Sequence, residues 1–325
     1  MSTLSWVIGR GGLLGSSVER AISTSTFRPD ELIAWQDRTR LHDQIVSTVA
    51  AFRMRLESNQ FSDCSVYWCA GAGVIGTSTE DLAAETAALR FFLDQLGYAL
   101  ECLPEISARV FLASSAGGVH GGSSDRPITE TTPPNPMSPY GWAKLEQENV
   151  LRDWVHAHPH VSTLIGRLSN LYGPGQRLDK PQGLISHMSR CVLFNVPVRI
   201  YVSLDTIRDY LYAEDAGTLI AAGMRRLCPV GSDAPQHLIK LYASEKETTI
   251  AALIGLFRDI AKRHLRLVNV RSPAGAQQPA KLHFRSAIWT DQRFLLRTEL
   301  LDGIHRVYQH QLMLLQAGRL PKPIS

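Results

Sequence analysis

The chain has 325 residues and a formal net charge of +4, from 34 Lys and Arg residues against 30 Asp and Glu residues. With 44% hydrophobic and 20% charged residues, its composition is that of a folded globular protein, which excludes a disordered or fibrous chain. The charge is small for this length, and no block of like charges predicts a surface for nucleic acid or membrane. The length favours a large domain with a smaller second lobe.

No metal site and no export signal are expected. The five cysteines are widely spaced, without a Cys-x-x-Cys pair or a zinc-type spacing, and this indicates reduced thiols in the cytoplasm. His156, His158 and His160 alternate at the end of an expected helix and do not share one helical face, so they predict a solvated terminus and not a metal site. No run of 18 apolar residues predicts a transmembrane helix, and the first residues lack the features of a signal peptide.

Strand-like and helix-like segments alternate through the first half of the chain, which is typical of an α/β fold with a doubly wound parallel sheet. Residues 4–8 predict a strand, and the next helix carries Leu14, Val18 and Ile22 on one face. Residues 32–35 predict the second strand. Three further helices are expected: one over 41–58, one that begins after a capping box at Thr77 and Glu80, and one that begins near Ser138. Three further strands are expected over 66–70, 110–113 and 161–168.

The chain is expected to divide near residue 170. Residues 1–170 predict a dinucleotide-binding Rossmann-type domain, and 171–325 a mainly substrate-binding, smaller C-terminal α/β lobe, because the alternation becomes irregular and Gly and Pro become frequent. Part of 197–230 is expected to return to the first domain. The rest of the second lobe is expected to hold an amphipathic helix around 250–257, an exposed loop over 271–280 and a final helix over 300–315.

A glycine-rich turn, Gly9-Arg-Gly-Gly12-Leu-Leu-Gly15, lies between the first strand and the first helix. Glycines permit a tight turn and close approach to a pyrophosphate, whose charge the amides at the helix N-terminus stabilise. The motif predicts cofactor contacts at Gly9, Gly12, Leu13, Leu14 and Gly15. The alternative is a turn with a structural role alone.

The cofactor can be NAD or NADP. An acidic residue about 20 positions beyond such a turn can hold the ribose hydroxyl of NAD, and Asp37 is the candidate. Arg38 and Arg40 beside it could instead hold the 2′-phosphate of NADP. The remaining interpretation is that all three are exposed loop charges.

Tyr140 and Lys144 lie at the expected start of a helix, and their spacing of four residues puts both side chains on one face. An ammonium group there can lower the pKa of the phenol and make it a usable acid or base. A single Tyr-x-x-x-Lys pair is common at protein surfaces, so its significance depends on the motifs around it.

Further blocks accompany the pair in a fixed order: 114–121 (SSAGGVHG), 128–130 (ITE), 134–144 (PNPMSPYGWAK), 167–175 (RLSNLYGPG) and 208–215 (RDYLYAED). With them the chain resembles, over nearly its whole length, the extended short-chain dehydrogenases/reductases, the nucleotide-sugar epimerase and dehydratase family. The resemblance implies that Tyr140 is the general acid/base and that Lys144 binds the nicotinamide ribose and tunes Tyr140. It also implies cofactor contacts in the turn of Cys69, Ala70 and Gly71.

The resemblance implies further residues of the site. The catalytic hydroxyl of many members falls at Ala116, four residues before an aromatic position that is here His120, so Ser115 is the candidate and Ser114 the alternative. Asn170 and Arg208 match family residues near the substrate diphosphate, and an arginine suits the recognition of phosphate. The structural alternative is that Arg208 pairs with Asp209.

The chain also departs from the family pattern. No segment between Asp37 and Val66 matches the usual third strand with its adenine-contacting Asp, and the Asn usual in the following helix is replaced near Glu85. A dehydratase is disfavoured, because that chemistry needs an Asp-Glu pair where Ala116-Gly-Gly118 stands.

The resemblance therefore implies an NAD(P)-dependent nucleotide-sugar epimerase acting by hydride transfer, with a homodimer expected and no nucleic-acid or membrane partner. An NADPH-dependent 4-keto-sugar reductase is the alternative that Arg38 and Arg40 favour. A non-catalytic dinucleotide-binding regulator on the same fold is a further alternative, against which the Tyr140 and Lys144 pair argues.

Overall fold

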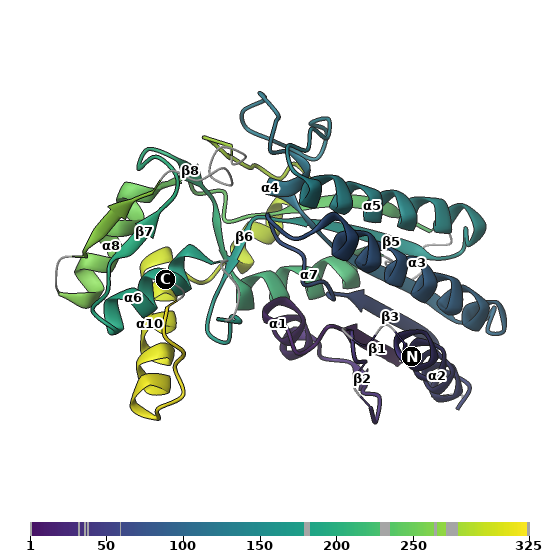
Figure 1. The fold of residues 1–325 in the computed structure, drawn as a ribbon. Coiled ribbons are helices and arrows are strands. Elements are labelled where there is room, and N and C mark those ends of the chain that lie inside the picture. Colours follow the sequence, from purple (N-terminus) through teal and green to yellow (C-terminus); the bar gives the residue numbers. More distant parts are fainter. Residues whose placement is uncertain are drawn as a thin grey trace.

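The computed structural model describes residues 2–31, 33–35, 37, 39–58, 60–178, 183–227, 235–262, 265–270 and 279–323. Within these ranges the chain forms a large sheet domain and a smaller lobe beside it (Figure 1). Arg38 and most of the expected loop over 271–280 lie outside the described residues.

The large domain is built on a six-stranded sheet with the strand order β10-β5-β4-β3-β1-β2, and all neighbouring strands are parallel. Every residue of β5 is buried, as expected for a parallel strand that is covered on both faces. The predicted Rossmann-type parallel sheet is confirmed. Its strands are β1 (Thr3–Ile8), β2 (Ser25–Phe27), β3 (Asp63–Trp68), β4 (Ser107–Ser115), β5 (Ser162–Leu168) and β10 (His237–Tyr242).

Two separate apolar cores cover the two faces of this sheet, because successive strand side chains point to opposite sides. Trp6 packs against Phe52 and Phe92 in one core, whereas Val7 packs with Val18 in the other. The helices of the first core are α2 (Leu41–Leu56), α3 (Thr79–Glu101) and α5 (Pro139–Ala157), and those of the second are α1 (Leu13–Ala21) and α7 (Ala213–Leu227).

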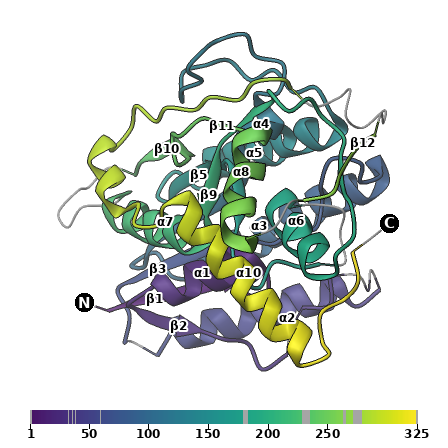
Figure 2. The same ribbon diagram turned by 90° about the vertical axis from the view of Figure 1, so that its left-hand side faces the viewer.

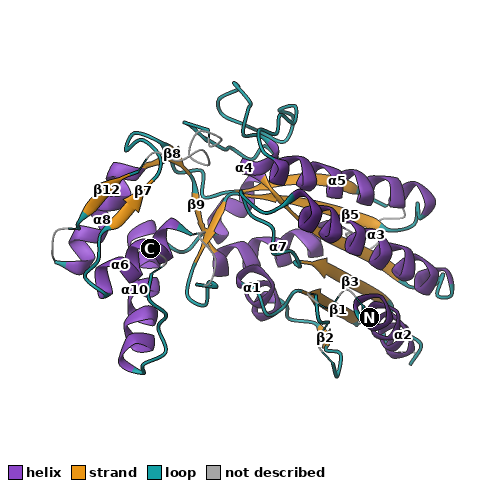
Figure 3. Ribbon diagram, in the orientation of Figure 1, coloured by secondary structure: helices purple, strands orange, loops and turns teal. Residues whose placement is uncertain are grey.

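The smaller lobe has its own core, in which α6, α8 and α10 contribute buried residues such as Ile185, Phe257 and Ile304. Figure 2, which turns this lobe toward the viewer, shows the three helices nearer to the viewer than the sheet domain, and Figure 3 shows that helices and strands are mixed in both parts. The predicted amphipathic helix and final helix are confirmed. The lobe contains α6 (Leu184–Leu193), α8 (Ile250–Ala261), α10 (Leu300–Gln316), β7 (Val198–Ile200) and β12 (Leu267–Asn269).

Short elements connect the two parts. The strand β6 (Asn170–Tyr172) pairs with β9 (Tyr210–Tyr212), and β8 (Ile207–Arg208) pairs with β11 (Thr248–Thr249). After these, α7 packs on α1 of the large domain; it lies inside the segment 197–230, part of which was expected to return there. β10, which lies beyond that segment, extends the main sheet. The division near residue 170 stays a prediction. The remaining short helices are α4 (Ala116–Val119) and η1 (Thr290–Leu295).

Two sequence-based expectations are wrong. The second strand is Ser25–Phe27, and residues 33–35 are not a strand. The Trp35 ring there packs edge-on against Trp68, with ring centroids 5.5 Å apart, so this apolar segment covers the core edge instead of joining the sheet. The N-cap of α3 is Ser78 and not Thr77, because Ser78 Oγ accepts from the amide of Asp81 at 3.1 Å.

The histidines near the end of α5 are part of a local packing arrangement. His158 stacks on Trp154 with ring centroids 4.3 Å apart, and its Nδ1 lies 2.9 Å from the Trp154 carbonyl oxygen. Within the described ranges, no three His, Cys, Asp or Glu side chains gather as a metal site would require. No helix in the described part of the chain is long and apolar enough to cross a membrane.

Candidate functional site

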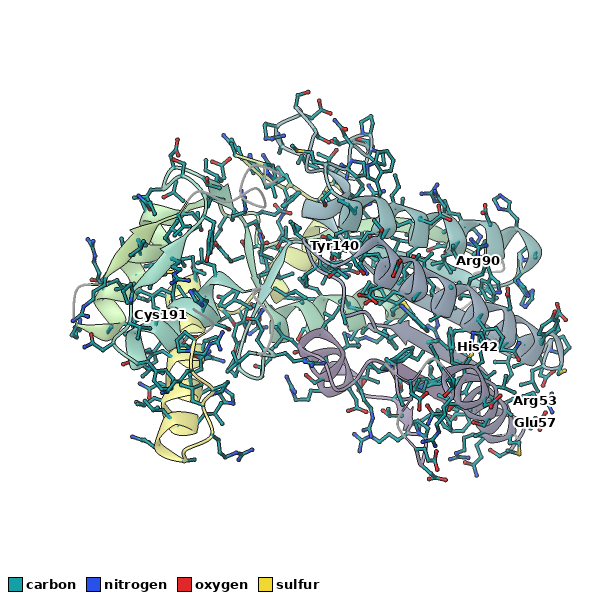
Figure 4. All side chains as sticks on the ribbon, in the orientation of Figure 1. His42, Arg53, Glu57, Arg90, Tyr140 and Cys191 are labelled. Carbon is teal, nitrogen blue, oxygen red and sulfur yellow. The ribbon has the colours of Figure 1, made fainter. Side chains whose placement is uncertain are left out.

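The predicted motifs meet at the carboxyl edge of the parallel sheet. β1 ends directly before Gly9, β3 directly before Cys69, and β4 at Ser115. In open α/β sheets this edge is where ligands bind. Figure 4 shows Tyr140 at the start of α5, on the side of the sheet domain that faces the smaller lobe.

The glycine-rich turn is packed so closely that it tolerates no side chain at two positions. Gly9 has a φ of +84°, and a Cβ there would lie 2.6 Å from the backbone nitrogen of Ala70. A Cβ on Gly15 would lie 2.2 Å from the Gly9 carbonyl oxygen. Gly12 is the N-cap of α1, whose first amides belong to Leu13 and Leu14. The structure thus brings this turn against Cys69 and Ala70.

The Ser115 and Tyr140 side chains lie against the same glycine, since a Cβ built on Gly118 would be 3.2 Å from Ser115 Oγ and 3.1 Å from Tyr140 Cε1. Each lies at a helix start: Ser115 caps α4, and Tyr140 follows Ser138, which caps α5. Ser114 is directed elsewhere, since its Oγ donates to Glu148 Oε1 at 2.6 Å. Of the two candidate hydroxyls, Ser115 is therefore the one that lies beside Tyr140.

Lys144 follows Tyr140 by one helical turn and is 9% exposed. Its Nζ donates to Gln147 Oε1 at 3.0 Å and to the Ala113 carbonyl oxygen at 3.5 Å, and it lies 6.0 Å from the Tyr140 ring centroid. Burial lowers the pKa of Lys144, and the carboxylates of Glu85 and Glu148 oppose this shift.

The pKa of Tyr140 is raised and not lowered, contrary to what the Tyr-Lys spacing predicted. Burial is the largest cause, because a phenolate loses its hydration in the interior. The Ser115 hydroxyl acts in the opposite direction and lowers the pKa, and the Glu85 carboxylate raises the pKa further. The phenol is therefore in its protonated form at neutral pH.

Glu85 is a charged group of the site for which the sequence indicated no role. From α3, its Oε1 accepts from the amides of Ala72 at 2.6 Å and Gly73 at 2.8 Å. Its Oε2 is buried without a hydrogen-bond partner. The sequence showed only that the Asn usual in this helix of the family is replaced near Glu85, and no motif indicated a role for the glutamate itself.

Asp37 has a local structural role. Its Oδ1 accepts from the Thr39 hydroxyl at 2.6 Å and from the amides of Thr39 and Arg40, closing the turn before α2. The Thr39 hydroxyl lowers the pKa of Asp37. Arg40 is exposed at the N-cap of α2. For Asp37 and Arg40, these contacts favour a role as charges of the loop over a role in binding the cofactor.

A pair of arginines next to the glycine-rich turn was missed by the sequence-based prediction. Arg10 lies inside the turn and Arg28 follows β2 directly, and their guanidinium nitrogens are 3.7 Å and 3.0 Å from Glu19 Oε1. Arg28 was overlooked because the second strand was placed too late in the chain. A residue at the end of this strand is where NAD and NADP are commonly distinguished.

Asn170 and Arg208 lie on adjoining segments at the junction with the smaller lobe. Asn170 Nδ2 donates to the Asp209 carbonyl oxygen at 2.8 Å. Arg208 is 8% exposed, and its Nη1 donates to the carbonyl oxygens of Ile207 at 2.9 Å and Pro279 at 2.7 Å. The Asp209 carboxylate accepts from the amide and hydroxyl of Ser244, so the expected alternative, an Arg208 to Asp209 pair, is wrong.

Comparison with known proteins identifies the family. The sequence profile of the NAD dependent epimerase/dehydratase family matches residues 6–229. The chain belongs to this family. This match confirms the resemblance found in the sequence.

Curated relatives match over shorter segments. A dTDP-4-dehydro-6-deoxyglucose reductase of Escherichia coli is 35% identical over 107 residues, which cover 33% of this chain and 33% of that protein. A dTDP-L-rhamnose 4-epimerase of Burkholderia thailandensis is 30% identical over 145 residues, which cover 42% of this chain and 40% of that protein. The matched segments span less than half of each relative.

Solved structures share the fold along almost the whole chain. UDP-glucose 4-epimerase of Thermus thermophilus in complex with NAD aligns with a TM-score of 0.73 at 18% identity, covering 95% of this chain and 98% of that one. The RMD protein of Pseudomonas aeruginosa complexed with NADPH gives the same score, identity and coverage. One of these two neighbours is complexed with NAD and the other with NADPH.

Proposed function

We propose that the protein is an NAD(P)-dependent nucleotide-sugar epimerase in which Tyr140 is the general acid/base. The observation that carries this proposal is the placement of Ser115 beside Tyr140 at the carboxyl edge of the sheet, with Lys144 one turn further along α5. The residues fit a dinucleotide, because Gly9 and Gly15 keep the turn before α1 free of side chains. When bound, the nicotinamide supplies the acceptor and donor of a hydride.

In the proposed reaction, Tyr140 handles the proton of the reacting sugar hydroxyl. The oxidation step requires the phenolate form of Tyr140, which takes this proton, and the phenol formed in that step returns a proton when the keto sugar is reduced on its opposite face. Ser115 holds the reacting oxygen beside the phenol and donates to the charge that develops on it. The raised pKa of Tyr140 keeps the proton on the phenol at neutral pH, which suits the step that donates to a carbonyl oxygen.

Asn170 and Arg208 are the proposed contacts of the substrate diphosphate. Both lie where the sheet domain meets the smaller lobe, on segments joined through the β6 to β9 pairing. The forked donor geometry of a guanidinium suits the recognition of a phosphate. The homodimer expected from the family stays a prediction.

A second candidate is an NADPH-dependent 4-keto-sugar reductase. The relative from Escherichia coli is described as a reductase of a 4-keto sugar nucleotide, and one structural neighbour is complexed with NADPH. Arg10 and Arg28 favour the same cofactor, because two guanidinium groups beside the glycine-rich turn suit a 2′-phosphate.

Mass spectrometry of the ligands that the purified protein retains tests the proposal, followed by assays with nucleotide-diphosphate sugars. Retained NAD and interconversion of two sugar epimers without net cofactor turnover are expected. Stoichiometric consumption of NADPH with a 4-keto sugar would instead identify the reductase. Dinucleotide binding with no turnover of any nucleotide sugar would favour the regulator and contradict both enzymatic candidates.

A further inference from the structure

Glu85 has the geometry of a ligand-binding carboxylate and not of a simple helix surface charge. One of its oxygens is fully used, because Oε1 accepts from the backbone amides of Ala72 and Gly73. The other, Oε2, is buried with no hydrogen-bond partner. An ionised carboxylate oxygen without a donor is costly in the interior, so the arrangement is incomplete until a donor arrives.

Lys144 faces the same space with spare donor capacity. An ammonium group has three N–H donors, and the Lys144 side chain uses two acceptors among the described residues, Gln147 Oε1 and the Ala113 carbonyl oxygen. No ion pair within 4.0 Å joins Lys144 to Glu85 in the described part of the chain, although the Glu85 charge raises the pKa of Lys144 against the effect of burial. The two charged groups are thus separated by a gap.

Gly71 marks where this gap lies. A Cβ built on Gly71 would be 3.5 Å from Glu85 Oε2 and 3.7 Å from Lys144 Nζ. The residue has a φ of +142°, and as a glycine it leaves this point free. A ligand group that occupies the space beside the Gly71 Cα can therefore contact the carboxylate and the ammonium together.

A hydroxyl group satisfies both sides, because it donates one hydrogen bond and accepts others. It would donate to the carboxylate and accept from the ammonium, whereas a phosphate would be repelled by the carboxylate. We propose that Glu85 is a ligand of the nicotinamide-side ribose, with Oε2 accepting from a ribose hydroxyl that also accepts from Lys144 Nζ. This inference rests on the dinucleotide binding of the proposed function.

Binding measurements with NAD⁺ and with its fragment ADP, which lacks the nicotinamide-side ribose, test the assignment. In Glu85→Gln the amide oxygen can still accept from Ala72 and Gly73, but an NH₂ group then faces the ribose and Lys144. The expected result is a roughly tenfold weaker affinity for NAD⁺, the scale of one hydrogen bond to a charged group, with the affinity for ADP unchanged. Glu80→Gln, at an exposed position of the same helix, is the control and should leave both affinities unchanged.

A measurement on the unmodified protein makes the test independent of whether the variant folds. Of the two NAD⁺ analogues that lack the 2′- or the 3′-hydroxyl of the nicotinamide ribose, one should bind roughly tenfold more weakly than NAD⁺. That loss should be smaller in Glu85→Gln, because the contact with the carboxylate is already removed there and only the contact with Lys144 remains to be lost.

Three outcomes overturn the inference while leaving the proposed function standing. Equal losses for NAD⁺ and ADP in Glu85→Gln would show that Glu85 acts by holding the Ala72 to Gly73 loop. An unchanged affinity for NAD⁺ in Glu85→Gln, or full affinity for both deoxy analogues in the unmodified protein, would show that no ribose hydroxyl is bound there. A wild-type protein that binds neither NAD⁺ nor NADP⁺ would overturn the proposed function together with this inference.

Discussion

Arg167 and Glu148 form a two-point ion pair in the protein interior, with Nε to Oε1 at 2.9 Å and Nη2 to Oε2 at 2.7 Å. The Arg167 side chain is 2% exposed and that of Glu148 0%. Glu148 also accepts from Ser114 on β4 at 2.6 Å, so the pair joins α5 to two strands of the sheet. Glu148 lies one helical turn beyond Lys144, and the pair therefore helps to position the helix that carries the candidate site.

Glu148→Gln is expected to destabilise the protein strongly, because it leaves the buried guanidinium of Arg167 without a counter-charge. Removal of one partner of a buried ion pair lowers the free energy of unfolding by about 3–5 kcal/mol. Glu146→Gln is a matched control two residues away, since Glu146 pairs with Arg90 at 3.6 Å on the exposed surface and such pairs contribute about 0–1 kcal/mol. Urea unfolding gives the free energy of unfolding of both variants. Equal losses in the two would show that the buried pair stabilises the protein no more than the exposed pair does.

His120 couples the same network to pH. Its Nε2 lies 2.9 Å from Arg167 Nη1, and burial, followed by the Arg167 charge, lowers the pKa of His120 from 6.5 to about 4. The unfolded state therefore binds more protons between these values, so the stability contribution is present above the unfolded pKa and is lost as the pH falls toward the folded one.

The wild type should consequently lose about 2 kcal/mol of unfolding free energy through His120 between about pH 7 and about pH 5. His120→Gln keeps an acceptor for Arg167 but cannot titrate, so its stability should fall less over this range. Denaturant unfolding of the two proteins at both pH values gives the difference. Parallel losses in both would mean that His120 does not titrate as its surroundings indicate.

The sequence predicted most of the sheet because buried strands such as β4 contain an apolar run, here residues 110–113, with polar residues on either side. It misplaced β2, which has three residues and lies at an edge where side chains are partly exposed. Such a strand leaves no apolar signal. The more apolar segment around Trp35 was preferred, although its function is to pack against Trp68.

Within the candidate site, the sequence predicted which residues lie close together when they are neighbours on one helix. It did not predict contacts between residues far apart in the chain. Tyr140 and Lys144 share a helix, so their proximity follows from the sequence. The approach of Glu85 to Gly71 depends on how α3 lies against the end of β3. The raised pKa of Tyr140 likewise depends on burial, which spacing along a helix does not reveal.

Arg28→Ala is expected to weaken NADP binding roughly tenfold while leaving NAD binding nearly unchanged, because a guanidinium recognises the 2′-phosphate that NAD lacks. The prediction depends on the position of Arg28 at the end of β2, next to Glu19. Arg20→Ala is the control, since Arg20 pairs with Glu214 on the exposed surface. Titration with both dinucleotides measures the effect, and equal changes for the two would remove Arg28 from the cofactor site.

Arg208→Lys is expected to raise the KM for a nucleotide-diphosphate sugar roughly tenfold and to leave dinucleotide affinity unchanged. The lysine keeps the charge but loses the forked donor geometry that matches a phosphate. Arg199→Lys, at an exposed position of β7 in the smaller lobe, should change neither quantity. A parallel fall in dinucleotide affinity in Arg208→Lys would indicate a structural role through the carbonyl oxygens of Ile207 and Pro279.

Tyr140→Phe is expected to lower turnover by about 10² or more, the scale of removing a positioned acid or base. The ring is kept and only the hydroxyl of the phenol is lost, so the fold and the dinucleotide affinity should survive. Lys144→Met should reduce both turnover and dinucleotide affinity, because this lysine is assigned to the nicotinamide ribose as well as to Tyr140. Steady-state assays with the converted nucleotide sugar, together with cofactor titrations, separate the two effects. Near-normal turnover in Tyr140→Phe would contradict the proposed mechanism, since the proton would then have to move through a group other than the phenol.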